Sequence, residues 1–190
     1  MFIRSERLFL RPGWPEDWAE LLALIDDEAV VRNLSRAPWP VRPDDARAFA
    51  CRPQAERHPH FFVTLPGASG ARLVGCVWLD DVDGEPELGF WIARAHWNRG
   101  YATEAVRAVL SLARTLGHGR LLASQFIDNA ACGRVLAKVG FAPTGDVRPR
   151  FSPARRGAVP AAIHQIDLGG AGNCDGDGNG PLPSRVMKAA

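Results

Sequence analysis

The sequence predicts a single domain of mixed α/β (α+β) type over residues 1–168, followed by a flexible tail over residues 169–190. Three observations lead to this fold class. Three short apolar stretches between residues 61 and 92 have turn residues between them, as in an antiparallel meander. Beyond residue 100 the apolar period changes from two to about 3.6 residues, which indicates a helix. From residue 169 to 180 the chain is rich in Gly, Asn and Asp, which is typical of a flexible segment.

The N-terminal part of the chain predicts one strand and three helices. A short strand is expected at Arg7–Arg11, where leucines alternate with the outward-facing arginines Arg7 and Arg11. Helices are expected where apolar residues have helical spacing, or where Pro and acidic residues open a segment. These helices are Pro15–Ile25, Ala29–Leu34 and Pro43 to about Ala55.

The rest of the domain alternates strands with two longer helices. The expected strands are Phe61–Leu65, Arg72–Leu79, Glu87–Ile92, Arg120–Phe126, one that starts at Phe141, and Ile163–Leu168. A polar turn at Asp80–Pro86 joins the second and third of these strands. An apolar stripe predicts a helix from Ala102 to Leu116, and a second helix is expected at Asn129–Val139, with Gly140 as its left-handed cap.

Composition and charge argue against several classes of protein. The 190 residues suffice to bury a core without disulfides or metal, and 46% hydrophobic and 23% charged residues are close to the averages of soluble proteins. The net charge of +2 is too small to suggest a nucleic-acid partner. The N-terminus is charged throughout, and no apolar run reaches the ~18 residues of a membrane span. We therefore expect a cytoplasmic protein with no membrane partner.

No metal site is expected. The four cysteines form no CxxC pair, so free thiols in a reducing cytosol are the simplest interpretation. The segment Asp175–Gly180 resembles the first half of an EF-hand loop, but Val186 stands where that loop needs a bidentate acid. The histidines also lack the spacing of zinc ligands.

The most informative segment follows the strand at Glu87–Ile92. A short polar loop, Asn98-Arg99-Gly100, leads directly into a helix. The first N–H groups of a helix lack intrahelical acceptors and carry partial positive charge, while Gly100 removes a side chain there and Arg99 adds a formal charge. Together they predict a cradle for a diphosphate, although an ordinary strand-to-helix turn fits the same residues. The patterns of a Walker A loop and of a dinucleotide fingerprint are absent.

A second informative segment is Asp128–Phe141. It begins with Asn129, whose side chain suits either a helix cap or a bond to a ligand amide. Taken together, WNRGYATEA and the later N-x-x-C-x-x-V-L-x-K-V-G-F resemble the GNAT acetyltransferases. The opening SERLFLRP resembles the branch that includes the ribosomal-protein N-terminal acetyltransferases, the RimJ/RimL-like group. The resemblance covers about residues 2–168.

The resemblance implies a GNAT-like fold, which is a mixed, mostly antiparallel twisted sheet of about seven strands with helices on both faces. Acetyl-CoA, as co-substrate, would lie in a split between the strands Glu87–Ile92 and Arg120–Phe126. The family's acyl-CoA motif, R/Q-x-x-G-x-G/A, falls on Trp97 to Ala102, where Trp97 replaces the usual Arg or Gln. Asn98 stands where the branch usually has Gly.

The same resemblance implies the acetyl-CoA contacts. The backbone amides of Arg99 to Thr103 would hold the pyrophosphate, and the end of the preceding strand would pair with pantetheine and polarise the thioester carbonyl. Asn129 would contact pantetheine, and Arg134 or Lys138 would lie near the adenosine phosphate. The full set is Ile92, Ala93, Asn98, Arg99, Gly100, Tyr101, Ala102, Thr103, Asn129, Arg134 and Lys138.

Two catalytic residues are expected from the resemblance. Glu87 matches a carboxylate that the family often uses as a general base, although a surface glutamate is an almost equal alternative. Cys132 stands where the branch often has Ser and could serve the leaving thiolate, or be a small buried residue. The only tyrosine, Tyr101, belongs to the phosphate loop, so no tyrosine general acid is assigned. Glu104 is expected to favour the helix dipole, and His96 to have a structural role.

The expected reaction is acetyl transfer to an amine, with a peptide N-terminus or a small molecule as acceptor and a monomer or homodimer as the assembly. The N-terminal helical region would form the acceptor pocket, with Trp14, Trp18 and Trp39 as an aromatic wall or as packing. The acids within residues 80–85 could attract a cationic acceptor, or simply solvate a turn. The alternative function is a non-catalytic acyl-CoA-binding sensor or partner-binding module.

Overall fold

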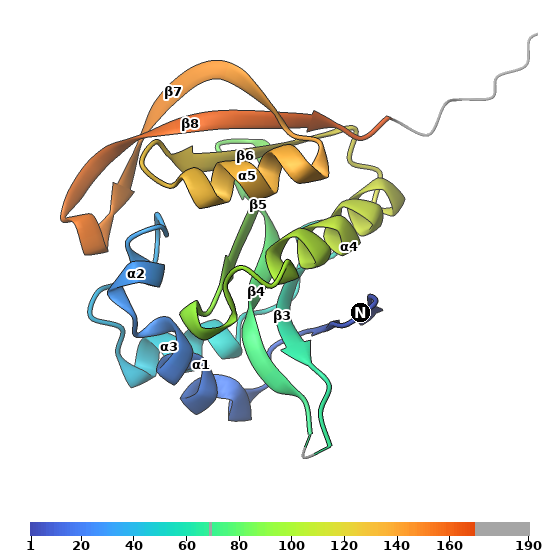
Figure 1. Ribbon diagram of the computed structural model, residues 1–190, viewed down its shortest axis with the longest axis vertical. Coiled ribbons are helices and arrows are strands. Elements are labelled where there is room, and N and C mark those ends of the chain that lie inside the picture. Colours follow the sequence, from blue (N-terminus) through green and yellow to red (C-terminus); the bar gives the residue numbers. More distant parts are fainter. Residues whose placement is uncertain (69, 170–190) are drawn as a thin grey trace, which may run out of the picture.

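A twisted sheet of eight strands runs through the molecule (Figure 1). The computed structural model describes residues 1–68 and 70–169. The strands are β1 (Ile3–Arg4), β2 (Phe9–Arg11), β3 (His60–Leu65), β4 (Arg72–Val82), β5 (Glu85–Ile92), β6 (Arg120–Phe126), β7 (Ala142–Ser152) and β8 (Gly157–Asp167). Their order in the sheet is β1-β2-β3-β4-β5-β6-β8-β7, and all neighbours are antiparallel except β5 and β6.

This architecture confirms the predicted mixed, mostly antiparallel sheet, with one strand more than expected. The additional strand is β1, a two-residue element that pairs with β2 through Ile3 and Leu10. Nearly all of the expected flexible tail, residues 170–190, lies outside the described residues. Its flexibility therefore stays a prediction.

Helices cover both faces of the sheet, as predicted (Figure 1). They are α1 (Trp18–Ile25), α2 (Glu28–Val31), α3 (Pro43–Ala50), α4 (Tyr101–Thr115) and α5 (Ala130–Val139), with single 3₁₀ turns at Pro15–Asp17, Arg94–His96 and Pro153–Arg155. In the described part of the chain, no helix is both long enough and apolar enough to cross a membrane.

Two cores fill the space between the helices and the sheet. Val106 of α4 and Leu136 of α5 belong to the first core, and Val31 of α2 belongs to the second. The adjacent residues Phe61 and Phe62 of β3 are both fully buried, one in each core, because successive side chains of a strand point to opposite faces. The continuous apolar run of β3 therefore reflects burial on both sides.

Element bounds differ from the predictions in several places. The expected polar turn at Asp80–Pro86 is a tight hairpin instead, because β4 and β5 pair as far as Val82 and Glu85. Only Asp83 and Gly84 form the loop, both with positive φ (57° and 83°), which is typical of a two-residue hairpin. Helix α3 ends at Ala50 rather than near Ala55, and α2 covers Glu28–Val31 rather than Ala29–Leu34. Strands β7 and β8 are also longer than their sequence patterns suggested.

The expectation that Arg11 faces solvent was wrong. Arg11 is only 5% exposed, and its two terminal nitrogens donate to the two carboxylate oxygens of Asp17, each at 2.7 Å. The guanidinium also stacks on the Trp14 ring at 3.8 Å. A bidentate pair allows a charge to be buried, so this pair fastens β2 to the start of α1.

Candidate active site

The sheet opens between β5 and β6. These parallel strands share a single bridge, between Glu87 and Leu122, and then diverge (Figure 1). A cavity of about 1170 Å³ occupies this region, and its lining includes Thr103 of α4, Cys132 of α5 and Phe49 of α3. The structure therefore contains the split that the resemblance implied.

The edge of β5 that faces the split carries backbone groups available to a ligand. The Ala93 N–H donates to the Val74 carbonyl at 2.8 Å, on the β4 side. Because antiparallel hydrogen bonding alternates, Phe90 and Ile92 direct their N–H groups toward the split instead. The indole N–H of Trp97 donates to the Ile92 carbonyl at 2.6 Å. Of the two residues predicted to pair with pantetheine, Ile92 directs its N–H toward the split and Ala93 does not. Phe90 also directs its N–H toward the split, but it was not among the predicted residues because the strand register is not visible in the sequence.

Two left-handed residues turn the chain into α4. Asn98 has φ of 60° and Gly100 has φ of 79°, and Gly and Asn reach this conformation at the lowest cost. Asparagine at position 98 can therefore take a conformation that otherwise favours glycine. A Cβ at Gly100 would touch only the Arg7 guanidinium, at 3.4 Å, so the space beside the loop is open. The N–H groups of the first turn, Tyr101–Thr103, are therefore accessible to an anion.

Most of the predicted site residues lie around one cavity. The predicted residues that line it are Glu87, Ile92, Asn98, Gly100, Tyr101, Ala102, Thr103, Asn129, Cys132, Arg134 and Lys138. Ala93 and Arg99 are not among its lining residues. The Arg99 carbonyl accepts a hydrogen bond from the Arg7 guanidinium at 3.0 Å, which ties the loop to the N-terminal segment.

A second, more open groove of about 820 Å³ crosses α4 and shares Gly100, Thr103 and Lys138 with the cavity. Arg107 lines this groove, and its guanidinium donates to the Lys138 carbonyl at 3.2 Å. Arg107 was not among the predicted residues. It lies one helical turn beyond Thr103, so the spacing of four residues from the phosphate loop was the signal that could have identified it.

The N-terminus of α5 forms the opposite wall of the split. Asn129 caps this helix, because its side-chain oxygen accepts from the Cys132 N–H at 3.2 Å. The capping interpretation of Asn129 is confirmed, and the residue lines the cavity as well. Burial raises the pKa of the Cys132 thiol to about 12, so the thiol stays protonated at neutral pH. Cys132 packs against the first core and also lines the cavity.

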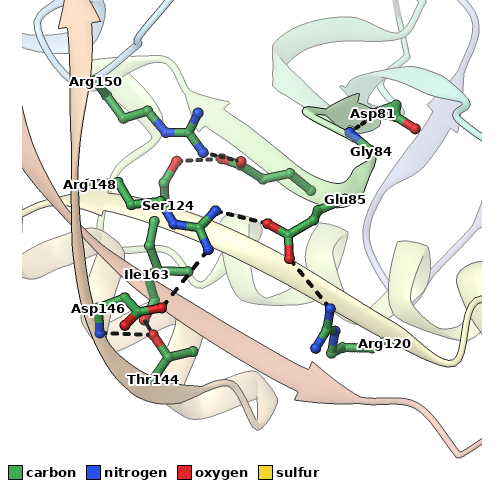
Figure 2. A network of polar contacts seen from close by, with 11 residues as sticks. Asp81, Gly84, Glu85, Arg120, Ser124, Thr144, Asp146, Arg148, Arg150 and Ile163 are labelled. Atoms are coloured by element: carbon green, nitrogen blue, oxygen red, sulfur yellow. Dashed lines mark hydrogen bonds and ion pairs between the residues drawn. The ribbon is translucent and has the colours of Figure 1, made fainter.

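Glu87 is held by side chains from two other strands, Ser124 and Arg150, which are labelled in Figure 2. Arg150 of β7 donates to one carboxylate oxygen at 2.7 Å, and the Ser124 hydroxyl of β6 donates to the other. The side chains of Glu87 and Arg150 are 15% and 18% exposed, so Glu87 is not a solvated surface glutamate. Each oxygen can accept a second hydrogen bond, so the carboxylate keeps capacity for a proton or a water.

Glu85, two residues earlier on β5, is also held by arginines from β6 and β7 (Figure 2). Arg148 of β7 donates to Glu85 at 2.8 Å, and Arg120 of β6 lies 3.4 Å from its other oxygen. The hydrogen bond from Arg148 lowers the pKa of Glu85 below its ordinary value. Arg148 and Arg150 lie more than 60 residues from their partners in sequence, and no local pattern signals these pairs.

The acids within residues 80–85 have separate roles. Asp81 accepts from the Gly84 N–H at 2.8 Å within the hairpin turn, and Glu85 is paired with arginines. Asp80 is the acid of this group that lines the cavity. It accepts from Arg36 at 3.1 Å and from Arg52 at 3.0 Å.

The aromatic wall of the cavity comes from residues other than the predicted tryptophans. Trp14, Trp18 and Trp39 are not among the residues that line the cavity, whereas Trp78 and Trp91 are. Trp18 and Trp39 pack against the second core, and the Arg11 guanidinium stacks on Trp14. The three tryptophans therefore have packing roles, which was the alternative to an aromatic wall of the acceptor pocket. The indole of Trp78 lies over Gly89, its cross-strand partner. It can lie there because Gly89 has no Cβ, which would collide with the ring.

Glu104 and His96 are two further polar residues near the loop that precedes α4, and the pKa of each is lowered. Burial alone would raise the pKa of Glu104, but hydrogen bonds from the Arg7 backbone, the Ser5 hydroxyl and the Arg7 guanidinium lower it below its ordinary value. Glu104 thus joins the N-terminal segment to α4. His96 lines the cavity, and burial followed by the charges of nearby arginines lowers its pKa, which favours the neutral ring.

Comparison with known proteins agrees with this geometry. Residues 7–142 match the family model of the acetyltransferase (GNAT) domain. The uncharacterized N-acetyltransferase YnaD of Bacillus subtilis (strain 168) is 26% identical over 148 residues, which cover 76% of this chain and 85% of YnaD. The uncharacterized N-acetyltransferase YoaA of the same strain is 40% identical over 63 residues, which cover 33% of this chain and only 36% of YoaA.

Solved structures share the fold. An acetyltransferase (GNAT family) from Bacillus anthracis aligns with a TM-score of 0.75 and 25% identity, covering 88% of this chain and 99% of that one. Mycobacterium smegmatis RimJ, in complex with CoA-disulfide, aligns with a TM-score of 0.71 and 22% identity, covering 84% of this chain and 81% of RimJ. At that identity RimJ shows the fold alone. With the family model matching residues 7–142, this chain belongs to the GNAT family of acetyl-CoA-dependent N-acetyltransferases.

Proposed function

We propose that the protein transfers an acetyl group from acetyl-CoA to a primary amine, which is a peptide N-terminus or a small-molecule amine. The observation that carries the proposal is the single cavity that joins the open N-terminus of α4 to the carboxylate of Glu87. One end of this cavity suits a diphosphate, and the other presents a proton acceptor beside an aromatic wall.

The residues of the cavity fit an acyl-CoA. The first-turn N–H groups at Tyr101–Thr103 would bind the pyrophosphate, where the helix dipole favours negative charge. The N–H groups of Phe90 and Ile92 would pair with the pantetheine arm, as an added strand pairs with a sheet edge. Asn129 lies opposite them on α5.

Three cationic side chains are available to bind the adenosine phosphate. Arg134 and Lys138 of α5 line the cavity, and Arg107 lines the groove that continues across α4. Together they support the expected phosphate contacts, with Arg107 as an addition to the predicted set.

The chemistry requires positioning more than strong base catalysis. Acetyl-CoA supplies an activated thioester. The amine nitrogen forms the new bond to the carbonyl carbon, the C–S bond breaks, and the proton lost by the nitrogen passes to Glu87, directly or through water. An α-amino group with a free pKa near ~7.7 is already partly neutral at physiological pH, so modest assistance suffices.

Arg150 and Ser124 would act as positioning residues for Glu87. They hold its two oxygens from β7 and β6, and this fixes the direction of the carboxylate in the cavity. Cys132 is the candidate partner of the leaving sulfur. With its pKa raised to about 12, compared with ~8.5 for a free thiol, it can donate a hydrogen bond, but full proton transfer to the thiolate is uphill.

We assign the chain to the RimJ/RimL-like branch on its opening SERLFLRP and on the loop that follows Trp97. The left-handed Asn98 supports this assignment, because asparagine tolerates the conformation that the branch's usual glycine provides. A protein N-terminus is the acceptor that this branch favours.

The test combines ligand binding with turnover. Thermal unfolding is measured with acetyl-CoA, CoA and ATP, and thiol release is measured in the same samples with a panel of amines and short peptides. A ligand that binds only the folded state raises the apparent stability. Stabilisation by acetyl-CoA and amine-dependent thiol release support the proposal. Stabilisation without thiol release favours the non-catalytic acyl-CoA sensor, and no stabilisation by either CoA species contradicts acyl-CoA binding.

A further inference from the structure

The acceptor end of the cavity contains a cluster of five charged side chains. Asp80 of β4 and Glu87 of β5 are direct cross-strand partners, so their side chains stand side by side on the same face of the sheet. Arg36 and Arg52 donate to Asp80, and Arg150 donates to Glu87. All five residues line the cavity. Three guanidinium groups thus surround two carboxylates, which leaves one net positive charge.

Arg36 and Arg52 are the solvent-accessible members of this cluster. The side chains of Arg36 and Arg52 are 63% and 40% exposed, whereas Asp80 between them is 19% exposed. Among the hydrogen bonds of the described residues, each of these two guanidinium groups donates once, to Asp80, although a guanidinium has about five N–H donors. Both arginines therefore keep donors for a second anion.

The other carboxylates along the cavity already have partners. Asp128 accepts two hydrogen bonds from Arg155, both at 2.8 Å, and one from Arg32 at 3.4 Å. Asp45 accepts from the Arg42 backbone N–H at 2.9 Å. Each carboxylate that lines the cavity within the described residues thus has at least one partner, and the arginines beside Asp80, Glu87 and Asp128 disfavour a second cationic group on the acceptor.

The wall beside the cluster is apolar. Trp78 and Gly89 are the next cross-strand pair on the face that carries Asp80 and Glu87, and the indole occupies the space left by Gly89. Phe49 of α3 also lines the cavity. This wall can pack against the carbon skeleton of an acceptor, beside the two guanidinium groups.

Resting on the proposed acetyl transfer, we propose that the acceptor amine carries an anionic group, a carboxylate or a phosphoryl group, which Arg36 and Arg52 bind while the amino group lies toward Glu87. The anion can belong to a free amino acid or to an acidic side chain next to a peptide N-terminus. Both sources share the chemistry that the two arginines recognise.

The first experiment compares amines that differ only in the charge at the far end. Initial rates are measured with γ-aminobutyrate, n-butylamine and putrescine, which have the same number of carbons and amines of similar basicity. A second arm uses dipeptide amides of alanine followed by glutamate, glutamine or lysine. We expect the anionic member of at least one arm to have a KM about tenfold lower than the neutral member, and the cationic member to be the poorest. The arm that shows this preference identifies the source of the anion.

Variants separate this inference from the function on which it rests. Arg36→Gln and Arg52→Gln should each raise the KM for the anionic amine about fivefold and leave kcat and the KM for acetyl-CoA unchanged. Asp80→Asn should act in the opposite direction, because it frees both guanidinium groups, and a lower KM would not result from mere structural damage. Arg47→Gln is the matched control, since Arg47 of α3 pairs with the exposed Asp44 away from the cavity.

Neutral or cationic amines that react as well as the anionic ones would overturn the inference and leave acetyl transfer intact. An unchanged preference in the Arg36→Gln/Arg52→Gln double variant would do the same. Absence of turnover with every amine, together with no stabilisation by acetyl-CoA, would overturn the proposed function and the inference with it.

Discussion

The two ends of the cavity are built in different ways. The end that we propose for acyl-CoA is made mainly of backbone, from the edge of β5 through Gly100 to the first turn of α4. The end that we propose for the acceptor is made of side chains, with Asp80 and Glu87 held by arginines from three separate segments. Backbone sites depend on conformation and tolerate most side-chain changes, whereas the side-chain site depends on pairs that single substitutions break.

The largest expected effect is at the acceptor end. Glu87→Gln should lower kcat about a hundredfold and leave the KM for acetyl-CoA unchanged, because it removes the proton acceptor and keeps the side-chain shape. Steady-state kinetics with saturating amine measure this loss. The control is Glu85→Gln on the same strand, which also removes an arginine partner but does not line the cavity. Equal losses of kcat in the two variants would contradict a catalytic role for Glu87.

At the acyl-CoA end, conformation should matter most. Gly100→Val should weaken acetyl-CoA binding at least tenfold, because a β-branched residue resists the positive φ that opens the loop. Isothermal titration with CoA measures the affinity. Gly117→Val is the matched control, since Gly117 has nearly the same φ, 78°, just beyond α4 and outside the cavity. Both variants should lose stability, and only the first should lose CoA affinity.

An intermediate effect is expected where β7 supports Glu87. Arg150→Gln should lower kcat/KM for the amine about tenfold, because the carboxylate loses the partner that orients it. Arg150→Lys should recover part of that activity by restoring the charge, which a purely structural role would not predict. Arg148→Gln, two residues earlier on the same strand, should have little effect on kcat/KM. A loss in Arg148→Gln as large as that in Arg150→Gln would contradict specific positioning.

A separate effect, on stability rather than on rate, is expected in acid. Burial, with a further contribution from Arg52, lowers the pKa of His60 from 6.5 to about 3. The ring packs against Phe49 and Trp78, both of which line the cavity. Below pH 6.5 the His60 ring of the unfolded chain is protonated, whereas in the folded protein it stays neutral down to about pH 3. The contribution of the neutral ring to the free energy of unfolding is therefore complete above pH 6.5 and is lost progressively between pH 6.5 and about 3.

The free energy of unfolding should therefore fall by up to roughly 1.4 kcal/mol per pH unit below pH 6.5. Urea unfolding at several pH values measures the slope, and His60→Gln should flatten it. A His60 ring that titrates near its ordinary pKa in NMR spectra of the folded protein would contradict this expectation.

Local signals in the sequence predicted most of the fold and the loop that leads into α4. The bounds of β6 match the prediction, and α5 has its asparagine cap and its left-handed Gly140 as expected. These features depend on a few adjacent residues, since caps and positive φ are properties of short segments. The buried pair of Arg11 and Asp17 shows the limit, because an alternating pattern cannot reveal that an arginine has a bidentate partner.

The sequence by itself determined the fold class and the position of the loop that we propose for a diphosphate, because a glycine before a helix is a local feature. Only the tertiary structure decided the character of the acceptor end. The strand register sets Asp80 beside Glu87, and the β7–β8 hairpin brings Arg150 back to them from more than 60 residues away. Net charge at a site is a sum over groups that meet only in the folded chain, so our proposal for the charge of the acceptor depends on the tertiary structure.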